Sequence, residues 1–438
     1  MASILFAAVP AHGHVTPLLA VARHFVTRGD RVRFLTGSRF AEVVEATGAQ
    51  HIPLPPEADF DDRQALDETF PERVRLKGVK SIAFDIEHVF VRPGRAQHDA
   101  VMTLHREERA DALIADTAFV GGAFMLGHPL GERPPIVVGG VDPLTIGSRD
   151  TAPYGMGLTP LSGPLGRLRN ALLNGLAART VFPRAERIAG AVNDTLFGRS
   201  LPFPVLDWPR HAEAIAQFTV PEFEYPRSDA PASLHFVGPI SASGSKAPPP
   251  PWWDDINGSR PVVHVTQGTV ANRDYEQVIA PTLKALAEQD LLVVVSTGGR
   301  PLDTLPPLPA NARAATYLPY DSLLPRTDVF VSNGGYGGVQ YALRYGVPVV
   351  TTSDQEDKPE VAARIAWSGA GRRLKTNRPT PAAVRTAVRS VLDEPGYRAR
   401  AQTIAASMAR VDSTKNLAQL VDDLTSGNHA TRRTSPSS

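Results

Sequence analysis

Short apolar runs without polar alternation recur along this chain, and segments with helical spacing lie between them. Residues 4–9 form the first run, residues 10–16 are rich in turn formers, and apolar residues then repeat at helical spacing up to Gly29. Strands buried on both faces of a parallel sheet have such continuous apolar sequences, and strands that alternate with helices are typical of doubly wound α/β domains. The pattern starts again at residues 262–265. We therefore expect an α/β fold with two Rossmann-like domains that face a central cleft.

The length of 438 residues suits two large domains or three small ones, because a typical domain has ~150 residues. We expect an N-terminal Rossmann-like domain over residues 1–225 and a C-terminal one over residues 253–411. Residues 226–252 contain a run of four prolines and are expected to form a semi-rigid linker. A helix over residues 412–425 is expected to cross back to the N-terminal domain, and the polar tail 426–438 is expected to be disordered.

Composition and charge exclude several classes of protein. Lys+Arg 46 against Asp+Glu 45 leave a formal charge of +1, without the basic face that holds nucleic-acid phosphates. The absence of cysteine excludes disulfides, thiolate nucleophiles, zinc–cysteine sites and iron–sulfur clusters. No apolar run approaches the ~18 residues of a membrane span, and the N-terminus lacks the basic segment of a signal peptide. We therefore expect a cytoplasmic protein with no nucleic-acid partner and no membrane span.

Two titratable residues follow predicted buried strands, at the strand ends where ligands collect in open α/β sheets. His14, with His12 two residues before it, follows the first strand and could act as a general base near neutral pH. Asp116 follows the apolar run 112–115 and could orient a histidine and stabilise its imidazolium form. The alternatives are a turn histidine and an ordinary helix N-cap.

Four glycines lie within residues 332–338, between a predicted strand and a predicted helix. Glycines at such a turn allow close approach of the backbone to a ligand, and the helix N-terminus offers free N–H groups to a phosphate. Thr269 follows another strand of the same domain and could add a hydroxyl donor. Neither a P-loop nor a dinucleotide fingerprint is present. The pattern therefore favours nucleotide phosphate over dinucleotide redox chemistry.

Two acidic segments are less specific. Residues 353–359 follow a strand and could bind sugar hydroxyls or form a solvated loop. Asp59 and Asp61 form a D-x-D triplet in an irregular segment of the other domain, and we interpret them as surface residues. No metal site is expected.

With these residues together, the chain resembles the family 1 glycosyltransferases of GT-B fold, which include bacterial macrolide and flavonoid glycosyltransferases. The resemblance covers about residues 1–425 and is sharpest over residues 329–359. The GHxxP element of that family matches residues 13–17. The resemblance implies that His14 is the catalytic base, that Asp116 is its partner and that the N-terminal domain binds the acceptor.

The donor-binding positions carried over from this family include several substitutions. Asn333 stands where the family has its phosphate-binding histidine, and an asparagine amide can still donate a hydrogen bond. Lys358 replaces a glutamine, which suggests an acidic sugar, although Lys358 could instead pair with Asp357. The implied donor residues are Thr269, Asn333, Gly335, Gly337 and Gly338 for the diphosphate, Tyr317, Gln340 and Tyr341 for the base and ribose, and Asp357 and Lys358 for the sugar.

The reaction implied by the resemblance is an inverting, metal-independent transfer of a hexose from a UDP- or dTDP-sugar to a hydroxyl of a lipophilic small molecule. No cofactor besides this co-substrate is expected, and the protein is expected to be a monomer or a homodimer. The expected acceptor residues, each of which could instead belong to the core, are Phe60, Phe84, Phe90, Tyr154 and Met156. Two alternatives stay open: an auxiliary nucleotide-sugar-binding protein without transfer activity, and a GT-B-like sugar-nucleotide epimerase.

Overall fold

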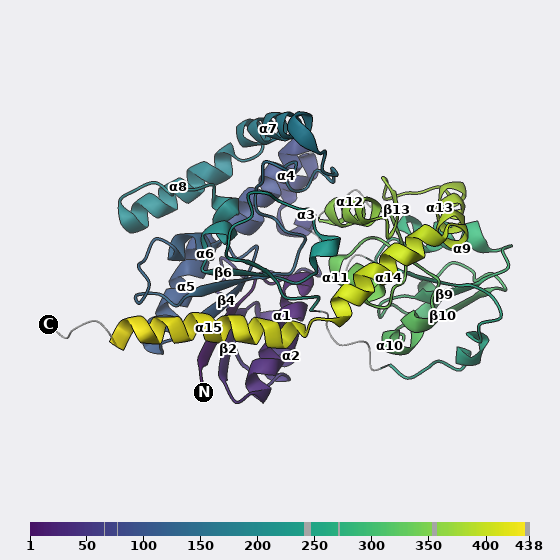
Figure 1. Cartoon of the computed structure of the whole chain (residues 1–438), viewed down its shortest axis with the longest axis horizontal. Coiled ribbons are helices and arrows are strands. Elements are labelled where there is room, and N and C mark those ends of the chain that lie inside the picture. Colours follow the sequence, from purple (N-terminus) through teal and green to yellow (C-terminus); the bar gives the residue numbers. More distant parts are fainter. Residues whose placement is uncertain (65, 77, 241–246, 270–271, 353–356, 434–438) are drawn as a thin grey trace.

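The structure is a computed structural model that describes residues 1–64, 66–76, 78–240, 247–269, 272–352 and 357–433. Its N-terminal part is an α/β domain with a seven-stranded sheet of order β3-β2-β1-β4-β5-β6-β7, and every pairing in this sheet is parallel (Figure 1). The strands are β1 Ser3–Ala7, β2 Arg31–Thr36, β3 Gln50–Pro53, β4 Ala112–Asp116, β5 Ile136–Gly140, β6 Ala214–Gln217 and β7 Leu234–Phe236.

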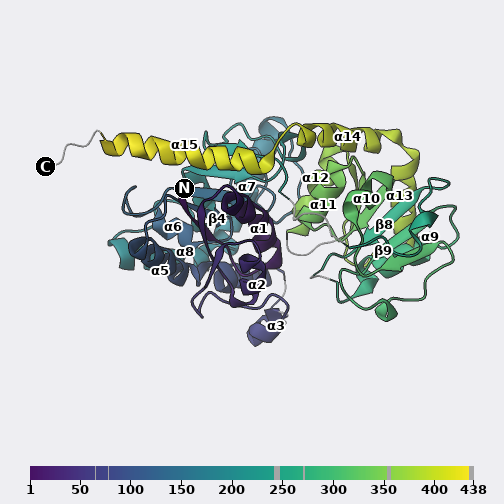
Figure 2. The same cartoon turned by 90° about the horizontal axis from the view of Figure 1, so that it is seen from below.

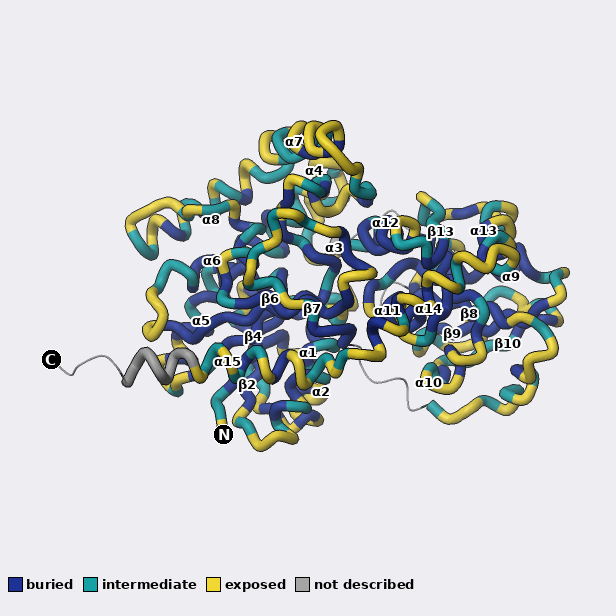
Figure 3. The backbone as a smooth tube through the Cα atoms, in the orientation of Figure 1, coloured by how far each residue is buried: buried dark blue, intermediate teal, exposed yellow. Residues whose placement is uncertain are grey.

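Both faces of this sheet are buried, as the continuous apolar runs predict. Ile4 and Phe6 of β1 belong to one hydrophobic core, and Leu5 and Ala7 belong to the other, because successive strand residues point to opposite faces. Helix α1 (His12–Thr27) packs in the first core, and helices α5 (Gly94–Glu107) and α6 (Gly121–Met125) pack in the second. Figure 3 shows the buried strands beneath more exposed helices.

The C-terminal part is a second α/β domain with a six-stranded parallel sheet of order β10-β9-β8-β11-β12-β13. Its strands are β8 Val262–Thr266, β9 Leu292–Ser296, β10 Ala312–Ala315, β11 Val329–Ser332, β12 Val349–Thr352 and β13 Gly371–Leu374. Helices α9 (Ile279–Leu286) and α13 (Pro381–Asp393) cover one face. Helices α11 (Tyr336–Arg344), α12 (Lys358–Ser368) and α14 (Pro395–Ala409) cover the other.

Apart from α15 and the short 3-10 helices, the remaining helices lie mainly in the N-terminal domain. They are α2 Ala41–Glu45, α3 Leu66–Thr69, α4 Val79–Asp85, the π-helix η3 Ile86–Val91, α7 Gly163–Thr180, α8 Pro183–Phe197, and, in the C-terminal domain, α10 Tyr320–Leu323. No helix in the described ranges is both long and apolar enough to cross a membrane.

The last helix, α15 (Ser413–Arg433), follows α14 but packs on the other domain. Leu417, Ala418 and Val421 are buried in the same core as α1. Figures 1 and 2 both show α15 lying along the N-terminal domain, while α14 lies on the C-terminal one.

Two expected boundaries need correction. The linker cannot start at residue 226, because β7 pairs with β6 in the N-terminal sheet, with Leu234 opposite Ile215. This strand has three residues between prolines, too few for a recognisable pattern. The C-terminal helix does not end at residue 425, because α15 continues to Arg433. Residues 241–246 of the expected linker and residues 434–438 of the expected tail lie outside the described residues.

Candidate active site

His14 and Asp116 are brought together at the carboxyl ends of neighbouring strands. His14 lies in the first turn of α1, directly after β1, and Asp116 is the last residue of β4, which pairs with β1. His14 Nδ1 lies 3.1 Å from Asp116 Oδ1. The Asp116 carboxylate is fully buried and also accepts the N–H groups of Val9 (2.7 Å) and Ala118 (2.6 Å). Because the carboxylate engages Nδ1–H, the Nε2 atom is left to exchange a proton with a substrate.

A third residue of this cluster, Asp142, was missed by the sequence analysis. Its Oδ2 atom lies 3.9 Å from His14 Nε2, and it accepts a hydrogen bond from Thr117 Oγ1 at 3.3 Å. Asp142 follows β5, the strand next to β4. Asp142 also follows an apolar run, residues 136–138, so the reasoning from strand ends that identified Asp116 applies to Asp142 as well.

Three carboxylates set the protonation of His14. Burial alone would lower the pKa of His14, but the charges of Asp142, Asp116 and Asp357 outweigh burial and raise this pKa to about 10. Burial raises the pKa of Asp357 to about 7, with the charge of Asp142 adding to the effect. Asp357 precedes α12 in the C-terminal domain, so a charge from each domain acts on His14.

This electrostatic balance predicts a pH dependence. Neutral His14 is the form that accepts a proton, and a raised pKa means that this form increases as pH rises above neutrality. Transfer measured as kcat/KM should therefore increase from pH 7 towards pH 9. In Asp142→Asn, which removes a nearby negative charge, the rising limb should move to lower pH. Asp412→Asn, at an exposed aspartate, is the control. If the pH profile of kcat/KM were the same in Asp142→Asn as in wild type, this role of Asp142 would be contradicted.

The glycine-rich turn after β11 has the geometry of an anion site. Gly334 has φ +86°, a left-handed conformation that glycine adopts readily, and Gly335 is the N-cap of α11. A Cβ atom added at Gly335 or Gly337 would meet nothing within 4 Å. Open space therefore adjoins the free N–H groups of the helix N-terminus, where phosphate binds favourably. Gly338 is exposed beside them.

Two other predicted donor residues lie at exposed positions of this domain. Thr269 follows β8, which pairs with β11, and is exposed. Tyr317 follows β10 and is 49% exposed. A Cβ atom at Gly299 would lie 2.3 Å from the Tyr317 hydroxyl oxygen, so the absence of a side chain at Gly299 lets the tyrosine lie against the backbone. The tyrosine ring is accessible to a nucleotide base.

Three predicted donor residues are engaged elsewhere. The Asn333 amide is buried and donates to the Gln267 carbonyl at 3.0 Å. The Gln340 amide, also buried, donates to the Phe218 carbonyl at 2.7 Å, and the Tyr341 hydroxyl donates to Asp321. In this structure, protein partners engage the Gln340 amide nitrogen and the Tyr341 hydroxyl, and contact of these two residues with ribose stays a prediction.

The predicted sugar-binding segment is described only in part. Residues 353–356 lie outside the described residues. Lys358, the first residue of α12, is buried, and burial lowers its pKa to about 8.

The predicted acceptor residues differ in exposure and in the groups that they contact. Tyr154 is 36% exposed, and burial together with the charges of Asp142 and Asp357 raises the pKa of its hydroxyl. Met156, two residues on, is 46% exposed. By contrast, Phe84 stacks on His88 with ring centroids 3.8 Å apart, and Phe90 packs against the N-terminal core. Phe60 is half-buried. The charges of Asp142 and Asp357 act on the Tyr154 hydroxyl, and a role of the five residues in acceptor binding stays a prediction.

Known proteins resemble this chain over almost its whole length. The family described as "Erythromycin biosynthesis protein CIII-like, C-terminal domain" matches residues 280–424. The 4'-demethylrebeccamycin synthase of Lentzea aerocolonigenes is 41% identical over 97% of this chain and 99% of its own length. UDP-glycosyltransferase 2 of Phaeomoniella chlamydospora is 35% identical over 96% of this chain and 95% of its own length. The solved structure of the calicheamicin glycosyltransferase CalG4 covers 100% of both chains with a TM-score of 0.72 and 22% identity.

Two parallel-sheet α/β domains in tandem and the likeness to CalG4 show the GT-B fold, and the relatives of 41% and 35% identity show the class of glycosyltransferases. The chain belongs to the family 1 glycosyltransferases of this fold, among relatives that include natural-product glycosyltransferases.

Proposed function

We propose that this glycosyltransferase moves a hexose from a UDP- or dTDP-sugar to a hydroxyl group of a lipophilic small molecule, with inversion at the anomeric carbon and without a metal. The observation that carries the proposal is the His14–Asp116 pair, in which Nδ1 is held and Nε2 is directed away from the buried carboxylate. The names of relatives support the donor class: one is a UDP-glycosyltransferase, and the spinosyn rhamnosyltransferase SpnG was solved with thymidine diphosphate.

The reaction proceeds in one displacement. His14 Nε2 takes the proton of the acceptor hydroxyl, and the oxygen forms a bond to the anomeric carbon as the bond from that carbon to the diphosphate breaks. Asp116 stabilises the imidazolium that forms. The electron pair leaves with the diphosphate, whose charge is stabilised by the N–H groups at Gly335–Gly338 and by the Thr269 hydroxyl.

The test is a transfer assay read by mass spectrometry, in which UDP-glucose and dTDP-glucose are offered separately with a panel of flavonoids, phenols and macrolides. A product heavier by one hexosyl group is the expected result, and the proton NMR coupling constant at its anomeric carbon should show the opposite configuration to the donor. Nucleotide binding without any product would favour the auxiliary-protein alternative. Epimerisation of the donor sugar in the absence of an acceptor would favour the epimerase alternative.

The metal-independent part of the proposal has its own test. Backbone N–H groups and the helix dipole stabilise the leaving diphosphate in this proposal, so no divalent cation is needed there. Transfer in excess EDTA should therefore stay within about twofold of transfer with added Mg²⁺. A loss that Mg²⁺ restores would show that a cation takes part.

A further inference from the structure

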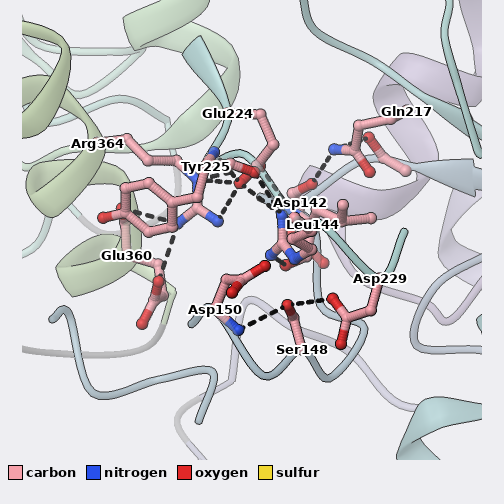
Figure 4. Close-up of polar contacts among 12 residues, drawn as sticks. Asp142, Leu144, Ser148, Asp150, Gln217, Glu224, Tyr225, Asp229, Glu360 and Arg364 are labelled. Carbon is pink, nitrogen blue, oxygen red and sulfur yellow. Dashed lines mark hydrogen bonds and ion pairs between the residues drawn. The ribbon is translucent and has the colours of Figure 1, made fainter. Parts of the chain in front are cut away.

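A buried ion-pair network joins the two domains beside the candidate active site. Arg364 of α12 donates to Glu224, with Nη2 2.6 Å from Oε1 and Nε 3.0 Å from both carboxylate oxygens. Glu224 belongs to the N-terminal domain segment that follows Phe223, and both side chains are almost completely buried. Figure 4 shows the guanidinium between Glu224 and Glu360.

On the N-terminal side, this network holds the start of one loop. Glu224 Oε2 accepts the N–H of Leu144 at 2.9 Å, and Arg227, which pairs with Glu224 at 3.2 Å, donates to the Leu144 carbonyl at 2.9 Å. Leu144 lies two residues after Asp142. The same loop continues to Tyr154 and Met156.

On the C-terminal side, Glu360 of α12 holds the far part of that loop. Its Oε1 atom accepts the N–H groups of Gly155 (3.0 Å) and Gly157 (2.8 Å), and its Oε2 atom pairs with Arg364 Nη1 at 2.9 Å. Arg373 donates to the Gly157 carbonyl at 2.6 Å. The Glu360 carboxylate of the C-terminal domain therefore holds two backbone N–H groups of this loop of the N-terminal domain.

The loop lies directly against the start of α12. Gly157 has φ +57°, and a Cβ atom there would lie 2.8 Å from the Pro359 carbonyl oxygen. Pro359 follows Lys358, and Glu360 lies three residues after Asp357, the residue whose charge reaches His14. The helix that is expected to contact the donor sugar thus also supports the loop that carries Tyr154.

We propose that Glu360 is a positioning residue for acceptor specificity: it fixes Tyr154 and Met156 over the reaction site, so that the donor-side domain completes the acceptor pocket. This inference rests on the proposed function. Loss of the Glu360 contact should affect acceptor binding and nucleotide binding differently. It releases the loop that carries Tyr154 and Met156, but it leaves the glycine-rich phosphate site untouched. Acceptor recognition should weaken while nucleotide binding does not.

The first variant is Glu360→Gln, whose side-chain amide cannot serve Arg364 and both glycine N–H groups at once. The expected result is an increase in acceptor KM of at least about tenfold, as for loss of hydrogen bonds to a charged group. The Kd of UDP or dTDP should stay within about twofold. Glu276→Gln, at an exposed glutamate of the same domain, is the control and should change neither value.

A second variant leaves the buried charges intact. Gly157→Ala forces the loop away from Pro359, whereas Gly155→Ala in the same loop, at φ +93°, meets no atom within 4 Å. Both replacements strain the backbone, so the difference between them reports the position of the loop. Acceptor KM should rise more in Gly157→Ala than in Gly155→Ala. Equal acceptor KM values for wild type, Glu360→Gln and Gly157→Ala would overturn the proposal.

Hydrogen exchange separates this inference from the proposed function. If the wild-type protein transfers no sugar, the proposed function fails, but the Gly155 and Gly157 amides still report the contact. Exchange at these amides should be faster in Glu360→Gln than in Glu276→Gln. Unchanged exchange would show that Glu360 does not hold the loop.

Discussion

Replacement of His14 by alanine should reduce sugar transfer by about 10²- to 10⁴-fold, the range that a positioned general base contributes. His14 Nε2 is the atom available to take the acceptor proton, because Asp116 engages Nδ1 at 3.1 Å. The proposed phosphate site lies in the other domain, at the start of α11. The affinity for UDP or dTDP, measured by calorimetry, should therefore stay within about twofold of the wild-type value.

His12→Ala is the matched control, since it removes the same side chain two residues away in the same helix turn. His12 lies beside Asp62 and Arg39, and burial lowers its pKa, so it does not share the carboxylate cluster of His14. Transfer by His12→Ala should stay near the wild-type rate. A His14→Ala enzyme with transfer within about twofold of wild type would show that another group removes the proton.

The architecture could be predicted because both sheets are parallel and buried on both faces. Such strands are continuous apolar runs, and β4, β5 and β8 are buried at every residue. Strand β7 could not be predicted, because its residues are not fully buried and its place depends on pairing with β6 rather than on local pattern.

The proximity of His14 and Asp116 could be predicted for the same reason, since position at a strand end is visible in the sequence. Position in a motif did not indicate the protein partners of Gln340 and Tyr341: the Gln340 amide nitrogen donates to the Phe218 carbonyl, and the Tyr341 hydroxyl donates to Asp321. Local sequence indicates which helix or strand carries a residue, but it does not indicate which distant group will form a hydrogen bond or an ion pair with its side chain. Glu224 and Arg364, 140 residues apart, could be paired only in the folded chain.

Replacement of Arg364 by methionine should produce the largest loss of stability among these variants. Arg364 is 1% exposed at its side chain and neutralises Glu224, which is fully buried. Removal of one partner of a buried ion pair typically costs 3–5 kcal/mol, because an uncompensated charge stays in the interior. Arg227 still pairs with Glu224 at 3.2 Å, so we expect about 3 kcal/mol, the lower end of that range. Urea unfolding followed by fluorescence would measure this loss.

The pH dependence of that loss identifies its cause. In the wild type, despite burial, Arg364 and Arg227 hold the pKa of Glu224 below its usual range, so this carboxylate stabilises the fold above the unfolded-state pKa. That contribution disappears as pH falls through the lowered pKa. Without Arg364, burial favours protonated Glu224, so acid should narrow the difference between wild type and Arg364→Met. The double variant Arg364→Met with Glu224→Gln should recover part of the loss at pH 7. A stability difference that is constant from pH 7 to pH 4, with no recovery in the double variant, would mean that lost packing of the arginine stem, rather than an unpaired charge, is responsible.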